Sequence, residues 1–180
     1  MLNRYKPIGT TAEVNFKTVR PCFRTRHSHI NQVVSDTETW EKTAAFRIEQ
    51  AAEDGLVEFY ARNDHLGLVV PYKHLEVRHD YEPDFLVHRA SGMTVLLEIK
   101  GYEDNKARAK HEAARRWVKA VNNWGRLGQW HFHVCRNPQV IQKELAALEH
   151  GVRWRGKGNS GCITGPQKSH NGPEIVRTSF

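Results

Sequence analysis

The sequence predicts an α/β protein in which helices flank a mixed central β-sheet. Several strand-like segments lie between two segments with helical periodicity, and one further strand-like segment follows the second helix. The predicted order is therefore helix, three or four strands, helix, strand, which is typical of a sheet covered by helices. A length of 180 residues favours a single domain with a proper hydrophobic core.

The first predicted helix lies within residues 34–55. Ser35 and Glu38 have the spacing of a capping box at its start, and Gly55 provides a stop at its end. Three residues form its apolar stripe: Ala45, Ile48 and Ala52. Glu41 falls in the middle of this stripe instead of on the solvated side, which is unusual for an acid.

Strands are predicted after this helix from two segments rich in β-branched and aromatic residues, VEFYARN and LGLVVPY. Residues 84–100, DFLVHRASGMTVLLEIK, are predicted to form two more strands joined by a short turn. The second helix is predicted over residues 107–124, with Gly125 ending it. A final strand is indicated by the alternating apolar residues Trp130, Phe132 and Val134.

The chain is predicted to divide into three parts. Residues 1–34 are expected to be an extended segment that packs on the core, and residues 35–137 form the core itself. Residues 138–180 are expected to contain a short helix and then a basic tail rich in Gly, Ser and Pro, which is predicted to be mostly disordered.

Composition narrows the class of partner. Lysine and arginine total 27 against 20 acids, a formal net charge of +7, which favours nucleic acid as partner and an anionic membrane surface as second choice. The three cysteines contain no CxxC pair, so neither a zinc ribbon nor a disulfide framework is indicated. No apolar run has the length of a membrane span, and we expect a cytoplasmic protein without a membrane partner.

The strand-like run TVLLEIKG carries charges that an apolar strand rarely accommodates. Glu98 and Lys100 project from the same face, because side chains alternate along a strand. If the preceding turn is centred on Ser91, Asp84 lies opposite Glu98, with Cβ atoms about 5 Å apart. Two carboxylates at this separation repel each other and raise each other's pKa unless a positive charge lies between them.

A divalent cation resolves this conflict. Mg²⁺, with Mn²⁺ as a substitute, favours oxygen ligands, which Asp84, Glu98 and the backbone carbonyl of Ile99 can supply. Lys100 can then orient a water nucleophile or stabilise charge on a phosphate, a chemistry suited to phosphodiester hydrolysis. Glu41 is a third acid that can reach the same ion directly or through water. The alternatives are a cross-strand Asp84–Lys100 ion pair and a Glu41 paired with an arginine.

Two groups of basic residues are candidates for phosphate contacts. The first is the RTRHSH cluster before the first helix, represented by Arg24, Arg26 and His27. The second lies on the second helix and includes Lys106, Lys110 and Arg115. Lys110 falls between two alanines of the apolar stripe, so we expect it to point along the sheet toward the carboxylates.

The ordered motifs PDF at 83–85 and EIKG at 98–101 resemble the PD-(D/E)XK nuclease superfamily. The chain is most similar to the endonuclease domain of the restriction subunit of type III restriction enzymes. That resemblance extends over about residues 14 to 138 and includes RTRHSHINQVVSDTETWE, AAEDGLVEFYARNDHLGLVVPY, YEPDFLV, LLEIKG and NNWGRLGQW.

The resemblance implies a restriction-endonuclease-like core and a Mg²⁺-dependent deoxyribonuclease with type II-like chemistry. Asp84 and Glu98 would be metal ligands, Lys100 the catalytic lysine, and Glu41 the additional acid of the first helix. The substrate would be double-stranded DNA. Alternatives that stay open are a non-catalytic nucleic-acid-binding module with the same fold, and a nuclease that cleaves transposon ends or branched DNA.

The sequence departs from that family in one large respect. Type III restriction subunits carry an ATP-driven helicase motor, whereas this chain has no GxxxxGK[ST] loop and therefore no predicted ATP site. A separate helicase or methyltransferase subunit is accordingly a candidate partner, and a homodimer is another arrangement left open.

Overall fold

The structure of the chain is a computed structural model that describes residues 14–34, 40–101 and 104–148. Its elements in chain order are β1 (Cys22–Arg24), β2 (Gln32–Val34), α1 (Trp40–Glu53), β3 (Val57–Arg62), β4 (Val70–His74), β5 (Val77–Tyr81), β6 (Phe85–Arg89), β7 (Met93–Ile99), α2 (Asn105–Trp124), β8 (Gln129–Cys135), the 3₁₀ turn η2 (Pro138–Val140) and α3 (Ile141–Ala147). None of the described helices combines the length and the apolarity needed to cross a bilayer.

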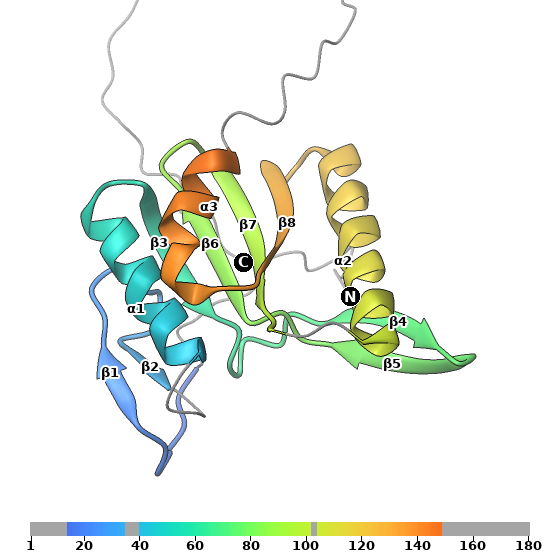
Figure 1. Ribbon diagram of the computed structural model, residues 1–180, viewed down its shortest axis with the longest axis horizontal. Helices are drawn as coiled ribbons and strands as arrows, with labels where there is room; N and C mark the ends of the chain where they lie inside the picture. Colours follow the sequence, from blue (N-terminus) through green and yellow to red (C-terminus); the bar gives the residue numbers. More distant parts are fainter. Residues whose placement is uncertain (1–13, 35–39, 102–103, 149–180) are drawn as a thin grey trace, which may run out of the picture.

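A mixed four-stranded sheet with the order β3-β6-β7-β8 forms the centre of the molecule (Figure 1). The first three strands pair antiparallel, whereas β7 and β8 run parallel and are connected through α2. Three strands of this sheet lie between α1 and α2 in the chain and the fourth follows α2. The predicted α/β class and the order helix, strands, helix, strand are therefore confirmed.

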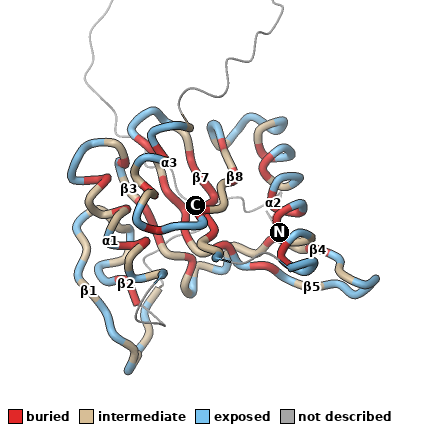
Figure 2. Tube along the Cα trace, in the orientation of Figure 1, coloured by how far each residue is buried: buried red, intermediate tan, exposed pale blue. Residues whose placement is uncertain are grey.

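Helices cover both faces of this sheet and create two hydrophobic cores. Helices α1 and α3 pack with Val95 and Leu97 on one face, while α2 and the hairpin β4–β5 pack with Leu86 and Leu96 on the other. Strand β7 is consequently buried on both sides, which explains why its sequence is a nearly continuous apolar run (Figure 2). A charge placed on this strand can lie only at its end.

The glycines predicted to end the two helices have the left-handed backbone conformation expected there, whereas the Asp104 cap of α2 was not predicted. Helix α2 is capped at its start by the side chain of Asp104, which accepts from the Ala107 N–H, and ends at Gly125 with φ 71°. Gly55 has φ 78° and its N–H donates to the carbonyl of Ala52 just after α1. The predicted capping box at Ser35 and Glu38 lies outside the described residues.

Hairpin β4–β5 was only partly predicted from the sequence. The segment LGLVVPY was expected to be a strand, but its antiparallel partner β5 was not anticipated. The two central residues of the turn, Leu75 and Glu76, have φ 49° and 61°. Such a turn usually carries Asn-Gly, because both positions require positive φ, so this sequence contains no recognisable turn signal.

The flanking segments pack against the core. In the amino-terminal segment, the backbone of His27 and His29 pairs with Tyr60 of β3, and Val33 belongs to the α1-side core. Helix α3 lies in a region expected to follow the core, yet Ile141 and Leu145 are 1% and 0% exposed within it. The described part of the chain after residue 137 is therefore continuous with the core. The predicted disordered tail lies outside the described residues.

Leu145→Ala should lower the free energy of unfolding by about 2–5 kcal/mol, because it leaves a cavity at a fully buried position of α3. Leu75→Ala is the matched control: the same atoms are removed at a side chain that is 83% exposed, and the change should stay within about 0.5 kcal/mol. Urea denaturation measures both values. Equal effects would show that α3 does not contribute to the core.

Candidate functional site

The register of β6 against β7 brings the two predicted carboxylates together. Phe85 pairs with Leu97 and the ladder continues to His88 with Thr94, so the next position places Asp84 opposite Glu98. Both side chains share the sheet face of Leu86 and Leu96, on the side of α2, as side-chain alternation requires. The spacing about Ser91 thus predicted the register that the strands adopt.

Each carboxylate has one oxygen held by a neighbouring donor. Oδ2 of Asp84 accepts from the backbone N–H of Ile99 at 2.7 Å. Oε2 of Glu98 accepts from the hydroxyl of Tyr81, also at 2.7 Å, in a buried hydrogen bond. These contacts fix the orientation of both groups and leave Oδ1 of Asp84 and Oε1 of Glu98 as the oxygens that can ligate a cation.

Burial raises the pKa of both carboxyl groups, and desolvation is the largest cause in each case. The charge of Asp84 raises the pKa of Glu98 further, and the two side chains are close enough to share a proton. The Ile99 N–H opposes this rise at Asp84, as the Tyr81 hydroxyl does at Glu98. The folded protein therefore favours the protonated form of this pair at pH values at which free carboxyl groups are ionised.

Two lysines lie on the Glu98 side of the pair. Lys110 of α2 and Lys100, just after β7, both lower the pKa of Glu98 through their charge. The ammonium nitrogen of Lys110 lies 5.4 Å from the centre of the Tyr81 ring, so it points toward the carboxylates as its place on the apolar stripe predicted. Asp84 does not form an ion pair with Lys100 among the described residues; it accepts from Ile99 instead.

Glu41 lies on the Asp84 side but is paired. Its Oε2 contacts the Arg62 guanidinium at 2.5 Å, which is the arginine pairing that the sequence left open. Glu41 still raises the pKa of Asp84 by repulsion, and Arg62 lowers it, so both charges are within electrostatic reach of that carboxylate. Glu41 is therefore held by Arg62 and acts on Asp84 through its charge.

Gly101 follows Lys100 at a point where a side chain would be crowded. A Cβ atom there would lie 3.1 Å from Cη2 of Trp40, the first residue of α1. The Trp40 ring thus packs against the chain directly after Lys100, and it links the start of α1 to the carboxyl end of β7.

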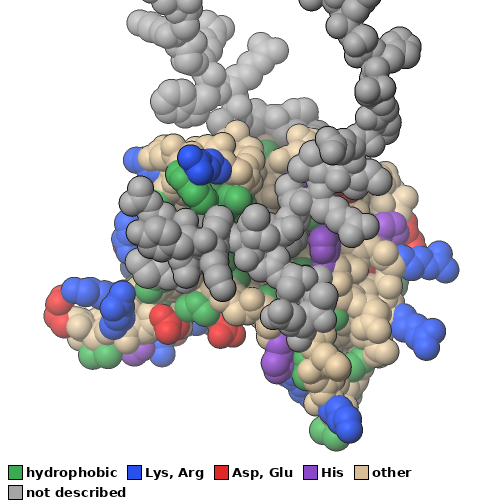
Figure 3. All heavy atoms as spheres, turned by 180° about the vertical axis from the view of Figure 1, so that it is seen from behind, with side chains coloured by type: hydrophobic (Ala, Val, Ile, Leu, Met, Phe, Trp, Pro, Cys, Tyr) green, Lys and Arg blue, Asp and Glu red, His purple; other side chains and the backbone are tan. Residues whose placement is uncertain are grey.

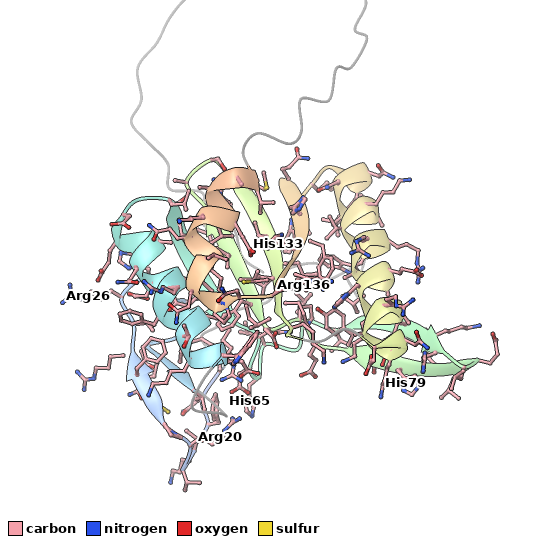
Figure 4. The ribbon with its side chains drawn as sticks, in the orientation of Figure 1. Arg20, Arg26, His65, His79, His133 and Arg136 are labelled. Carbon is pink, nitrogen blue, oxygen red and sulfur yellow. The ribbon has the colours of Figure 1, made fainter. Side chains whose placement is uncertain are left out.

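The predicted phosphate-binding residues fall into separate regions. Arg24 and Arg26 are exposed on the amino-terminal segment, while Nδ1 of His27 lies 3.0 Å from Oε1 of Glu49. Figure 4 shows Arg26 beside the outer side of α1 and His79 on hairpin β4–β5, at opposite sides of the view. The residues on α2 are exposed or partly buried: Lys106, Lys110 and Arg115. Only Lys110 of the six is close enough to shift the pKa of Glu98.

The residues present fit a hard divalent cation. Among the described residues, no group of three or more His, Cys, Asp or Glu side chains is arranged to hold a metal. Mg²⁺, however, needs only one or two carboxylates because it retains several waters. Asp84, which is partly buried, and Glu98, which is buried, provide two adjacent carboxylates with one oxygen each available, and Ile99 is already fixed against Asp84 through its N–H.

Comparison with known proteins found no matching family model, no matching curated protein and no matching solved structure. The chemistry of this site is therefore inferred from the side chains themselves.

Two residues of the site were not anticipated from the sequence. Tyr81 holds Glu98, and Arg62 holds Glu41. The sequence did contain a signal for β5, because Val77, His79 and Tyr81 alternate with the charged residues Arg78 and Asp80. Such alternation is typical of a strand and places the tyrosine on the less polar face. No comparable signal existed for Arg62, because its contact depends on how α1 docks beside β3.

In the absence of divalent ions, Glu98→Gln should stabilise the protein at about pH 8 by on the order of 1 kcal/mol and much less at about pH 5. The carboxyl groups of Asp84 and Glu98 have raised pKa values in the folded protein, so they retain a proton that the unfolded chain has lost. The free energy of unfolding therefore falls as the pH rises through the neutral range. The glutamine keeps an oxygen for Tyr81 but removes the repulsion.

Urea denaturation at the two pH values measures this difference, with the exposed Glu53→Gln as control. If Glu98→Gln changed the stability equally at both pH values, the two carboxylates would not be coupled as described.

Proposed function

We propose that this chain is a Mg²⁺-dependent deoxyribonuclease of the PD-(D/E)XK type, with a restriction-endonuclease-like core and Asp84, Glu98 and Lys100 as its active site. One observation carries the proposal: a partly buried and a buried carboxylate face each other at the ends of β6 and β7, and two lysines lie beside them. The order helix, strands, helix, strand agrees with the core of that superfamily.

Two lysines beside two carboxylates are well suited to a phosphodiester. When bound by Asp84 and Glu98, Mg²⁺ would lower the pKa of a coordinated water and neutralise charge on the phosphate. Lys100 donates hydrogen bonds to the attacking water or to a non-bridging phosphate oxygen. In hydrolysis the water oxygen bonds to phosphorus and gives up a proton, the bond between phosphorus and one ester oxygen breaks, and that oxygen takes up a proton from solvent.

Other groups maintain this arrangement. Tyr81 and the Ile99 N–H fix the carboxylate orientations, and Lys110 adds positive charge where a phosphate would approach. Glu41, held by Arg62, acts on Asp84 through its charge, and we do not assign it as a direct ligand. The net charge of +7 favours DNA as the substrate, and a helicase or methyltransferase subunit remains a proposed partner.

Asp84→Asn and Lys100→Met should each reduce plasmid nicking in the presence of Mg²⁺ by roughly 10²–10³-fold, because each removes one group that acts on the transferred phosphate. Lys143→Ala, an exposed lysine on α3, and Glu53→Gln are the matched controls and should retain wild-type activity. Nicked and linear forms are quantified on agarose gels.

Equal cleavage by wild type and by both site variants would eliminate this site assignment. Absence of cleavage by the wild type, together with tight duplex binding, would favour the non-catalytic binding module instead.

A further inference from the structure

Hairpin β4–β5 is anchored at its base and projects at its tip (Figure 1). Val70, Tyr72 and Tyr81 are buried against α2 and the sheet. Toward the turn the ribbon becomes exposed, and Leu75 and Val77 are 83% and 57% exposed. Figure 3 shows basic, acidic and hydrophobic side chains together at this projecting end. The base of the hairpin is part of the hydrophobic core, whereas the exposed residues of its tip are not.

The outer face of the ribbon carries an unfavourable pair. Lys73 lies directly opposite Arg78 in the register, and both side chains are exposed. Like charges directly opposite each other destabilise a hairpin. Neither side chain makes an ion pair or a hydrogen bond within the described residues. A phosphate group would relieve this repulsion, because its oxygens accept from both cations at once.

The turn itself is strained for its residue types. Leu75 and Glu76 both have positive φ, a conformation that residues with a Cβ rarely adopt. Asn-Gly would form the same turn without this strain, yet a leucine is presented to solvent at the first position. Proteins that bind the minor groove of DNA often insert apolar side chains, leucine among them, between base steps. Strain combined with an exposed apolar tip points to a binding role.

The ribbon is connected directly to the carboxylate pair. Its last residue, Tyr81, donates to Glu98, and Asp84 follows three residues later. The base of the ribbon therefore lies beside the two carboxylates, and its tip projects away from them. Glu76 and Asp80 lie on the same face of the ribbon as Lys73 and Arg78, because side chains alternate along each strand, and the formal charge of this face is zero. Attraction of a duplex therefore depends on the two cations contacting a phosphate directly.

We propose that hairpin β4–β5 is a duplex-binding ribbon, in which Lys73 and Arg78 together contact the DNA backbone and Leu75 enters the adjacent groove. DNA-binding proteins place β-ribbons in the major or in the minor groove. The inference rests on the proposed function for its choice of DNA as partner, and it extends that function by assigning the surface that positions the duplex.

The first test compares two double variants in the Glu98→Gln background, which prevents cleavage. Lys73→Ala/Arg78→Ala should weaken binding to a short DNA duplex by roughly tenfold or more and reduce the slope of log K against log salt by about two. Arg116→Ala/Lys119→Ala removes the same charge from the exposed side of α2 and should change the affinity less than about twofold. Fluorescence anisotropy at several salt concentrations measures both.

The second test separates the structural role of the turn from its binding role. Leu75→Asn/Glu76→Gly introduces a relaxed turn and removes an acid, so it should raise the melting temperature. Removal of an acid alone would strengthen attraction to DNA. Weaker duplex binding by this more stable variant would therefore show that Leu75 contacts the duplex.

The proposal would be overturned if both ribbon variants bound the duplex with unchanged affinity. It would also be overturned if the α2 control lost as much duplex affinity as Lys73→Ala/Arg78→Ala. A change of oligomeric mass in light scattering, with duplex affinity unaltered, would also overturn it and indicate a protein-binding tip. The nicking assay with Asp84→Asn is independent of these results, so a failure of the ribbon and a failure of the nuclease site can be told apart.

Discussion

The antiparallel register of β6 and β7 is the constraint on which this site depends. Because the side-chain period of a strand is two, a slip of one residue would move Glu98 to the face of α1 and would bury it among apolar residues. The register is held on both sides of β7: by His88 paired with Thr94 near the turn, and by parallel pairing with β8. The strand register therefore places Asp84 opposite Glu98 without any bound ligand.

The fold tolerates this convergence of charge because each group has a specific neighbour. The Ile99 N–H and the Tyr81 hydroxyl donate to one carboxylate each, and Lys100 and Lys110 provide positive potential on the side of Glu98. These contacts reduce the cost of burial without eliminating it, since both pKa values stay raised. A site that is incompletely neutralised by its own protein is a strong candidate for binding a cation.

Much of this arrangement was accessible from the sequence for identifiable reasons. Gly55 and Gly125 mark helix ends, and the even spacing of Asp84 and Glu98 about Ser91 predicts their pairing. Strand β5 was missed because Leu75 and Glu76 do not resemble turn residues, although they adopt turn geometry. The pairing of Glu41 with Arg62 depends on the docking of α1, and docking geometry is not encoded in local periodicity.

The most direct test of the account is the number of protons released when Mg²⁺ binds. Isothermal titration calorimetry in buffers of different ionisation enthalpy measures this number for the wild type and for Glu98→Gln. If Asp84 and Glu98 form one site that holds either a proton or a cation, binding near about pH 6.5 should release about one proton, and the release should vanish near about pH 9. Glu98→Gln should bind Mg²⁺ far more weakly. Mg²⁺ binding that is unaffected by Glu98→Gln, or no binding by the wild type, would contradict the account.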